Sequence, residues 1–257
     1  MKQALVNGIS VGFQDSGGDG PVVLLSHGFL MDHSMFDLQV SALKENFRVI
    51  TWDERGFGAT QALTDFTYWD SARDAIGLLD HLGIDKAVIG GMSQGGFISL
   101  RLALLAPERV RALILIDTQS GTEDPSKVEG YNGLHDAWME HGPAPVQEIV
   151  AGLILGPGDW PEWTNKWAAL DRPQFSRAFH CLMDRDDITP RLAEINAPAL
   201  ILHGSLDQAI PVVKAEILRD QLTGKAELVV IDGAPHAANL THPIETNAAI
   251  LRFLNAL

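Results

Sequence analysis

The sequence predicts an α/β fold in which helices cover both faces of a mostly parallel sheet. Apolar runs of strand length alternate along the chain with amphipathic helical segments, as in a βαβ succession. Most of these runs carry no polar face, which is typical of strands that helices cover on both sides. A chain of 257 residues with 46% hydrophobic residues is sufficient for one large domain, or for one domain with an insertion.

The N-terminal part is predicted to form a hairpin followed by two buried strands. Asn7-Gly8 lies between two short apolar stretches and suits the positive φ angles of a type I′ turn. The two strand runs that follow end in glycine-containing turns, and apolar residues keep helical spacing between them. In chain order the elements are a hairpin over 4–6 and 9–13, a strand within 21–29, a helix within 33–46 and a strand within 47–58.

The rest of the core continues the same alternation, which favours parallel strands joined by right-handed crossovers. It resumes after an irregular stretch and ends in a C-terminal helix. The predicted elements are a helix over 68–83, strand 86–91, helix 94–108 and strand 109–117, then strand 197–204, helix 211–222, strand 226–232 and a helix from about 242 to 254.

The irregular stretch runs from about Gln119 to Asp187. It contains several prolines and four of the six tryptophans, and linkers are rarely so aromatic. We therefore expect short helices with proline-marked corners. Residues 119–187 are predicted to form a helical cap, or lid, on a core made of residues 1–118 and 188–257.

A candidate nucleophile lies between the strand at 86–91 and the helix that follows it. Gly91-Met92-Ser93-Gln94-Gly95 has the G-x-S-x-G pattern in the strand–turn–helix context that this motif requires. In such a turn the backbone is strained, the serine hydroxyl projects above the sheet, and the glycines let neighbouring backbone pass closely. The pattern predicts that Ser93 is a catalytic nucleophile.

Two partners follow Ser93 in the order that such a site needs. Asp207 follows the strand at 197–204, and His236 follows the strand at 226–232, so all three loops leave the carboxyl end of the sheet. His236 is predicted to take the serine proton as general base, and Asp207 to orient and stabilise the imidazolium.

The oxyanion that forms in such a reaction needs two hydrogen-bond donors. The backbone N–H of Gln94 begins the helix after the nucleophile, where the helix dipole adds favourable charge. The N–H of Phe29, just after His27-Gly28 on the neighbouring strand, is the second predicted donor.

Along nearly its whole length the chain resembles the α/β-hydrolase superfamily. This resemblance implies an eight-stranded, mostly parallel sheet with a small helical cap. Gln94 stands where many relatives of the most similar branch carry Met or Leu. That branch contains 3-oxoadipate enol-lactonases and small carboxylesterases, and is similar to serine-type acyl-homoserine lactone hydrolases. The matching segments are residues 27–29, 53–58, 91–96, 107–117, 200–207 and 233–243.

Other residues compete for two of these roles. His203 at the end of an apolar strand and His242 at the start of the last helix are alternatives to His236, each with a structural role as the simpler interpretation. Asp117 ends a buried strand and is an alternative to Asp207. Chain order favours the Ser93 partners named above.

The substrate pocket and one charged turn complete the candidate residues. Leu30, Trp138 and Trp160 are predicted to line the pocket, because the cap should lie over the strand ends. Asp53 and Arg55 would form a charged pair beside the site, which is more typical of a structural corner than of direct chemistry.

The composition of the chain limits the classes of partner that it is expected to bind and the compartment in which it is expected to lie. A net charge of −14 argues against nucleic acid and against an anionic membrane surface. One cysteine, Cys181, allows no disulfide within the chain, and the N-terminus lacks the apolar core of a signal peptide. With no apolar stretch of membrane-spanning length, a cytoplasmic location is expected. The histidines show no zinc-type spacing, so no metal and no cofactor are predicted.

These observations predict a serine hydrolase that cleaves a largely uncharged, medium-sized carboxylic ester or lactone through an acyl-enzyme. An acyl-homoserine lactone and an enol-lactone are the candidate lactones. Two alternatives share the fold and the triad: a receptor that binds a lactone signal, and a cofactor-free perhydrolase or haloperoxidase that uses peroxide.

Overall fold

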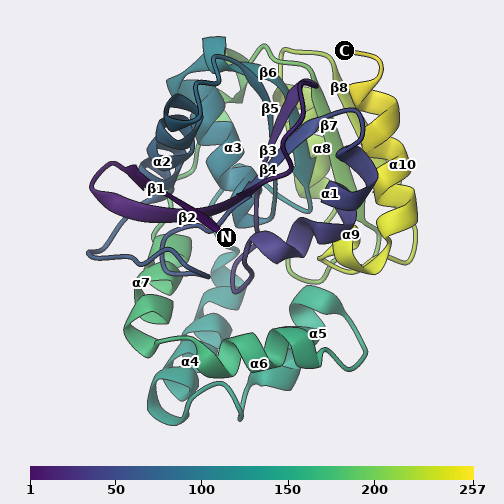
Figure 1. The fold of residues 1–257 in the computed structure, drawn as a ribbon. Helices are drawn as coiled ribbons and strands as arrows, with labels where there is room; N and C mark the ends of the chain where they lie inside the picture. Colours follow the sequence, from purple (N-terminus) through teal and green to yellow (C-terminus); the bar gives the residue numbers. More distant parts are fainter.

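The computed structural model describes residues 1–257, and its centre is one eight-stranded sheet in the order β1-β2-β4-β3-β5-β6-β7-β8 (Figure 1). Strands β3 to β8 are parallel, whereas β1 and β2 pair antiparallel with each other and β2 with β4. The predicted mostly parallel sheet is confirmed. Its strands are β1 (Lys2–Val6), β2 (Ile9–Asp15), β3 (Val22–Ser26), β4 (Arg48–Trp52), β5 (Ala87–Met92), β6 (Val110–Ile116), β7 (Ala199–Gly204) and β8 (Ala226–Ile231).

The hairpin at the edge turns where the sequence predicts. Asn7 and Gly8 have φ angles of 48° and 82°, the two positive values that a type I′ turn requires.

Helices cover both faces of the sheet, and the side chains of each inner strand divide between two buried cores. On β3, Leu24 joins the core under α2, α3 and α8, whereas Val23 and Leu25 join the core under α1, α9 and α10. This alternation follows from the two-residue period of a strand. The core helices are α1 (Asp37–Leu43), α2 (Tyr68–His81), α3 (Gln94–Leu105), α8 (Val213–Gln221), α9 (Ala238–Thr241) and α10 (Pro243–Leu254).

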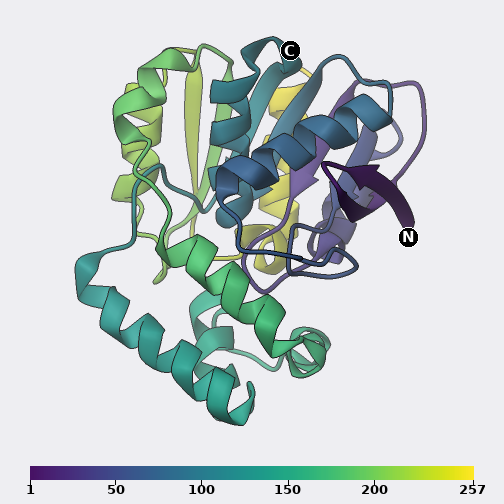
Figure 2. The same cartoon turned by 90° about the vertical axis from the view of Figure 1, so that its left-hand side faces the viewer.

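Between β6 and β7 the chain leaves the sheet and forms four further helices, which lie together beyond one end of it (Figures 1 and 2). Each of three begins with proline at its first or second position, where a missing N–H costs nothing. No helix is long and apolar enough to cross a bilayer. The four helices are α4 (Pro125–His141), α5 (Gln147–Leu155), α6 (Pro161–Ala169) and α7 (Arg172–Met183).

Some predicted boundaries were wrong. The helix expected within 33–46 is a 3-10 turn at His33–Phe36 followed by the short α1, and α9 was not predicted. A helix as short as α9 leaves no periodic signal in a sequence.

Candidate active site

Ser93 occupies a sharp turn between β5 and α3. Its φ of 52° is a value that residues other than glycine rarely adopt. The backbone is held there by two hydrogen bonds: the Ser93 N–H donates to the Ile116 carbonyl at 2.8 Å, and the Thr118 hydroxyl donates to the Ser93 carbonyl at 2.7 Å. A Cβ on Gly95 would overlap the carbonyl oxygen of Ser26 on β3, so the turn requires glycine at that position.

Asp207 and His236 form a buried pair in the loops after β7 and β8. The Nδ1 atom of His236 lies 2.7 Å from Oδ2 of Asp207. The other carboxylate oxygen of Asp207 accepts hydrogen bonds from the backbone N–H groups of Ala209, at 2.8 Å, and Ile210, at 2.9 Å. The carboxylate is therefore fixed in place, and it orients the imidazole with Nδ1 as the donor.

Each member of this pair shifts the pKa of the other in the direction that favours the charged form. Burial alone would raise the pKa of Asp207, but the charge and hydrogen bond of His236 outweigh it and lower the pKa below the ordinary range. Burial alone would lower the pKa of His236, but the attraction and hydrogen bond of Asp207, with further attraction from Asp117, raise it above the ordinary value. An imidazolium that forms during a reaction is thereby stabilised.

Ser93 and His236 line the same cavity, whose volume is about 120 Å³. Fifteen of its nineteen lining residues are hydrophobic, and none is a lysine or arginine. Its one carboxylate, Glu123, lies 3.2 Å from the buried Arg185. The apolar wall includes Phe29, Leu30, Met92, Phe97, Leu134, Trp138, Phe175, Phe179 and Ile210.

Two backbone N–H groups belong to a residue that follows Ser93 and to a residue that shares its cavity, Gln94 and Phe29. Gln94 is the first residue of α3, so its N–H has no acceptor within the helix. Phe29 is in the loop after β3, the strand next to β5, and its N–H makes no hydrogen bond within the protein. Both N–H groups are free to bind an oxygen atom.

The fold and this arrangement agree with the comparison to known families. A family model described as the alpha/beta hydrolase fold matches residues 21–243. The chain belongs to this family.

Its relatives include esterases and lactonases. The present chain is 28% identical in sequence to 3-oxoadipate enol-lactonase 1 of Acinetobacter baylyi, and the alignment covers 88% of this chain and 85% of the lactonase. Among solved structures, an esterase from Thermogutta terrifontis is 29% identical, with a TM-score of 0.86 and coverage of 99% and 98%. The enol-lactonase of Burkholderia xenovorans is 25% identical, with a TM-score of 0.90 and coverage of 99% and 100%.

The rival residues of this hydrolase make other contacts. Asp117 accepts hydrogen bonds from the backbone N–H groups of Gly204 and Ala238, at 2.7 and 3.0 Å, and so ties together the loops after β7 and β8. His203 is buried behind Asp207, with Nε2 2.8 Å from the Ile210 carbonyl.

His242 lies just before α10, and its side chain makes no cap hydrogen bond there.

Two expectations need correction. Trp160 is not among the residues that line the cavity, because it precedes α6 and its indole lies beside Gly158. Asp53 and Arg55 do not pair with each other: Arg55 binds Asp74 on α2, with Nε 2.5 Å from Oδ2, and Asp53 binds a histidine. The two side chains therefore have partners on different elements, Asp74 on α2 and His33 in the 3-10 turn.

Sequence reasoning also missed most of the cavity wall that α4 and α7 supply. Tyr131, Leu134 and Trp138 are three and four residues apart on α4, and all line the cavity. Phe175 and Phe179 have the same spacing on α7. This periodicity is a signal that the sequence carries, because residues three or four apart share one face of a helix.

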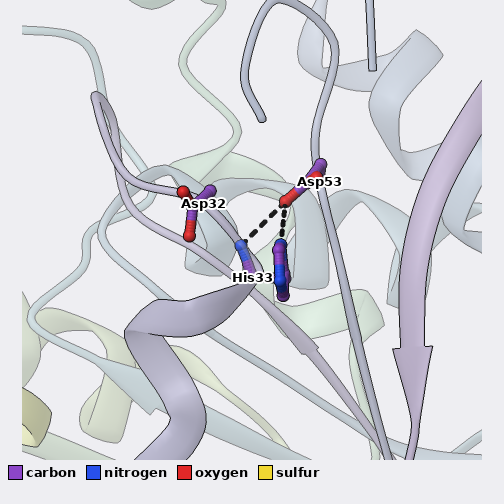
Figure 3. A group of neighbouring side chains, drawn as sticks. All are labelled: Asp32, His33 and Asp53. Atoms are coloured by element: carbon purple, nitrogen blue, oxygen red, sulfur yellow. Dashed lines mark hydrogen bonds and ion pairs between the residues drawn. The ribbon is translucent and has the colours of Figure 1, made fainter. Parts of the chain in front are cut away.

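A second group of acidic residues with a histidine consists of Asp32, His33 and Asp53 (Figure 3). Asp32 and His33 lie in the segment after β3, and Asp53 directly follows β4. Oδ1 of Asp53 accepts hydrogen bonds from the N–H of His33 at 2.8 Å and lies 2.7 Å from His33 Nδ1, while Oδ2 accepts from the Ala59 N–H at 2.8 Å. Asp32 is bound by Lys166 at 3.0 Å. The carboxylate oxygens of Asp32 and Asp53 and Nδ1 of His33 thus all have protein partners.

Proposed function

We propose that this hydrolase cleaves a neutral carboxylic ester or lactone through an acyl-enzyme on Ser93. The observation that carries the proposal is that a serine on a strained turn and an Asp-supported histidine open onto one apolar cavity. A serine hydroxyl is a weak nucleophile unless an adjacent base takes its proton. Two histidines line the cavity, His135 and His236, and His236 is the one that a buried aspartate orients.

The proposed reaction has two halves. Ser93 Oγ attacks the carbonyl carbon while His236 takes the hydroxyl proton, and the N–H groups of Phe29 and Gln94 bind the oxyanion. His236 returns the proton to the departing alkoxide, which leaves an acyl-enzyme. Water, deprotonated by His236, then attacks the acyl carbon and releases the acid and free Ser93. Asp207 keeps the imidazole oriented throughout.

The lining of the cavity supports an uncharged acyl group. It contains no lysine or arginine, and its one carboxylate, Glu123, is paired with Arg185, so the lining offers no fixed cation to bind an anionic substrate group. An enol-lactone of 3-oxoadipate, a diacid, keeps one free carboxylate, so it is a poor fit even though relatives are named as enol-lactonases. We propose residues 119–187 as the cap over the strand ends, with Leu30 and Trp138 in the acyl wall.

The test measures turnover of p-nitrophenyl esters of increasing acyl length together with neutral and carboxylate-bearing lactones. We expect a burst of nitrophenol equal to the enzyme concentration, and kcat/KM that rises with acyl length until the cavity is filled. Ser93→Ala should lower kcat by about 10³- to 10⁶-fold, because it removes the nucleophile. Normal turnover by Ser93→Ala would refute the mechanism, and a preference for the carboxylate-bearing lactone would refute the substrate class.

A further inference from the structure

The side chain of Gln94 is held by two buried partners. Its Nε2 donates a hydrogen bond to Oε2 of Glu54 at 2.7 Å, and its Oε1 accepts one from the Tyr68 hydroxyl at 3.1 Å. All three residues are almost completely buried, at 1%, 1% and 3% exposure for Gln94, Glu54 and Tyr68. The residue whose N–H is a proposed oxyanion donor is thus tied to the turn after β4 and to the start of α2.

Glu54 reaches the other proposed donor through its backbone. Its N–H donates to Nε2 of His27 at 3.0 Å, so the proton of the neutral ring is on Nδ1, which lies 2.8 Å from the Gly28 carbonyl oxygen. Burial lowers the pKa of His27 and keeps the ring neutral. The Gly28 carbonyl and the Phe29 N–H belong to one planar peptide unit, so a bond to one fixes the direction of the other.

The geometry points to Glu54 as a positioning residue that aims both backbone donors of the oxyanion hole, Gln94 through its carboxyl group and Phe29 through His27. This inference rests on the proposed function. Hydrogen-bond donors stabilise an oxyanion only when they are fixed in place before the reaction, so a small reorientation lowers the rate. The same linkage accounts for a glutamine at position 94. A buried amide needs polar partners for both its oxygen and its nitrogen, and Tyr68 and Glu54 supply them.

Two further observations separate this role from a contribution to stability. Oε1 of Glu54 is buried without a partner, an arrangement that costs free energy and is uncommon in protein cores. Burial, together with the charge of Asp53, raises the pKa of Glu54 well above the ordinary range. A raised pKa favours the uncharged carboxyl group, which places less negative charge behind a developing oxyanion.

The test compares Glu54→Leu, Gln94→Met and the double variant with Glu54→Gln. Glu54→Gln is the matched control, because it keeps the size of the side chain and an oxygen that can accept from Gln94. Turnover is expressed per active site, counted by titration with a fluorophosphonate, so that misfolded protein does not contribute. Ser93→Ala has no serine for the fluorophosphonate to label, so its turnover is measured in parallel per mole of folded protein.

We expect Glu54→Leu and Gln94→Met each to lower kcat by about 10- to 100-fold with little change in KM, less than the loss from deleting a donor outright. The double variant should lose no more than either single one, because the changes break one linkage. Affinity for a trifluoromethyl ketone, which forms an oxyanion on Ser93, should fall in parallel with kcat, while Glu54→Gln should stay near wild type.

Wild-type kcat per active site in Glu54→Leu, or fully additive losses in the double variant, would overturn the role of Glu54. If Glu54→Leu does not fold, Gln94→Met removes the other partner of the same hydrogen bond, and wild-type kcat per active site in that variant would overturn the role equally. Normal turnover in Ser93→Ala would instead refute the proposed function, so the two failures are distinguishable.

Discussion

The molecule contains two Asp–His pairs of nearly the same geometry, and they differ in what surrounds the histidine. Asp207–His236 and Asp53–His33 both join Nδ1 to a carboxylate oxygen at 2.7 Å, and both carboxylates follow a parallel strand and accept backbone hydrogen bonds. His236, however, lines a cavity that it shares with Ser93, whereas His33 is absent from that cavity.

The same Asp–His geometry therefore occurs both at the cavity that Ser93 lines and away from it, so the geometry of the pair does not by itself mark a catalytic site. The charges act alike in both places: each carboxylate has a lowered pKa, and each histidine a raised one despite the opposing effect of burial. What distinguishes the pairs is the neighbour of the histidine. His236 lines a cavity that Ser93 also lines. The Asp53–His33 pair instead connects the turn after β4, which carries Glu54, to the 3-10 turn at His33–Phe36.

The largest expected effect comes from removing each histidine in turn. His236→Gln should lower kcat by about 10⁴- to 10⁶-fold, because Ser93 loses its base. His33→Gln should leave kcat per titrated active site close to wild type. Steady-state kinetics on one p-nitrophenyl ester checks both, and equal losses in the two variants would show that the comparison is wrong.

A smaller effect concerns pH. His236 must be neutral to accept a proton, and its pKa is raised, so kcat/KM should increase with pH through an apparent pKa above about 6.5. In Asp207→Asn the effect of burial is opposed only by the attraction of Asp117 and Glu123, which act less strongly than Asp207, so the His236 pKa should fall from its wild-type value.

Titration of the imidazole protons by NMR measures the His236 pKa in the wild type and in Asp207→Asn. A boronic acid bound to Ser93 should move the His236 titration and leave that of His33 in place. A His236 titration unchanged in Asp207→Asn would contradict the assigned pairing.

The smallest expected effect is on stability. The folded-state pKa of His33 is raised, so its pairing with Asp53 stabilises the protein fully below the unfolded pKa of about 6.5 and less as pH rises through the folded value. His33→Gln should therefore cost on the order of 1 kcal/mol of unfolding free energy at pH 5.5, and less at pH 9. Urea unfolding at the two pH values measures this, and a larger loss at pH 9 would contradict the sign.

The sheet, and the order of the loops that carry Ser93, Asp207 and His236, were predictable because both depend on local sequence patterns. Apolar runs, Asn7-Gly8 and the glycines around Ser93 each specify backbone conformation over a few residues. Asp207 and His236 could be located by counting strands, since parallel strands bring their carboxyl ends to one edge.

What the sequence left open depends on contacts between distant segments. The orientation of a helix in the segment between β6 and β7 decides whether Trp138 or Trp160 meets the cavity, and neighbouring helices set that orientation. Glu54 is a charged residue in a turn, for which exposure is the ordinary expectation. Its burial against Gln94, 40 positions away, becomes visible only in three dimensions.

The close approach of Gly95 to β3 has a consequence for how this enzyme can diversify. One added methyl group at position 95 would push against Ser26, and the loop that leaves that strand carries Phe29. Ser93 and Phe29, which we propose as nucleophile and oxyanion donor, would therefore shift together, so a substitution at position 95 is expected to disturb both. The helices between β6 and β7 have no such constraint, and libraries that seek new substrates should vary residues there while leaving the glycines of the turn intact.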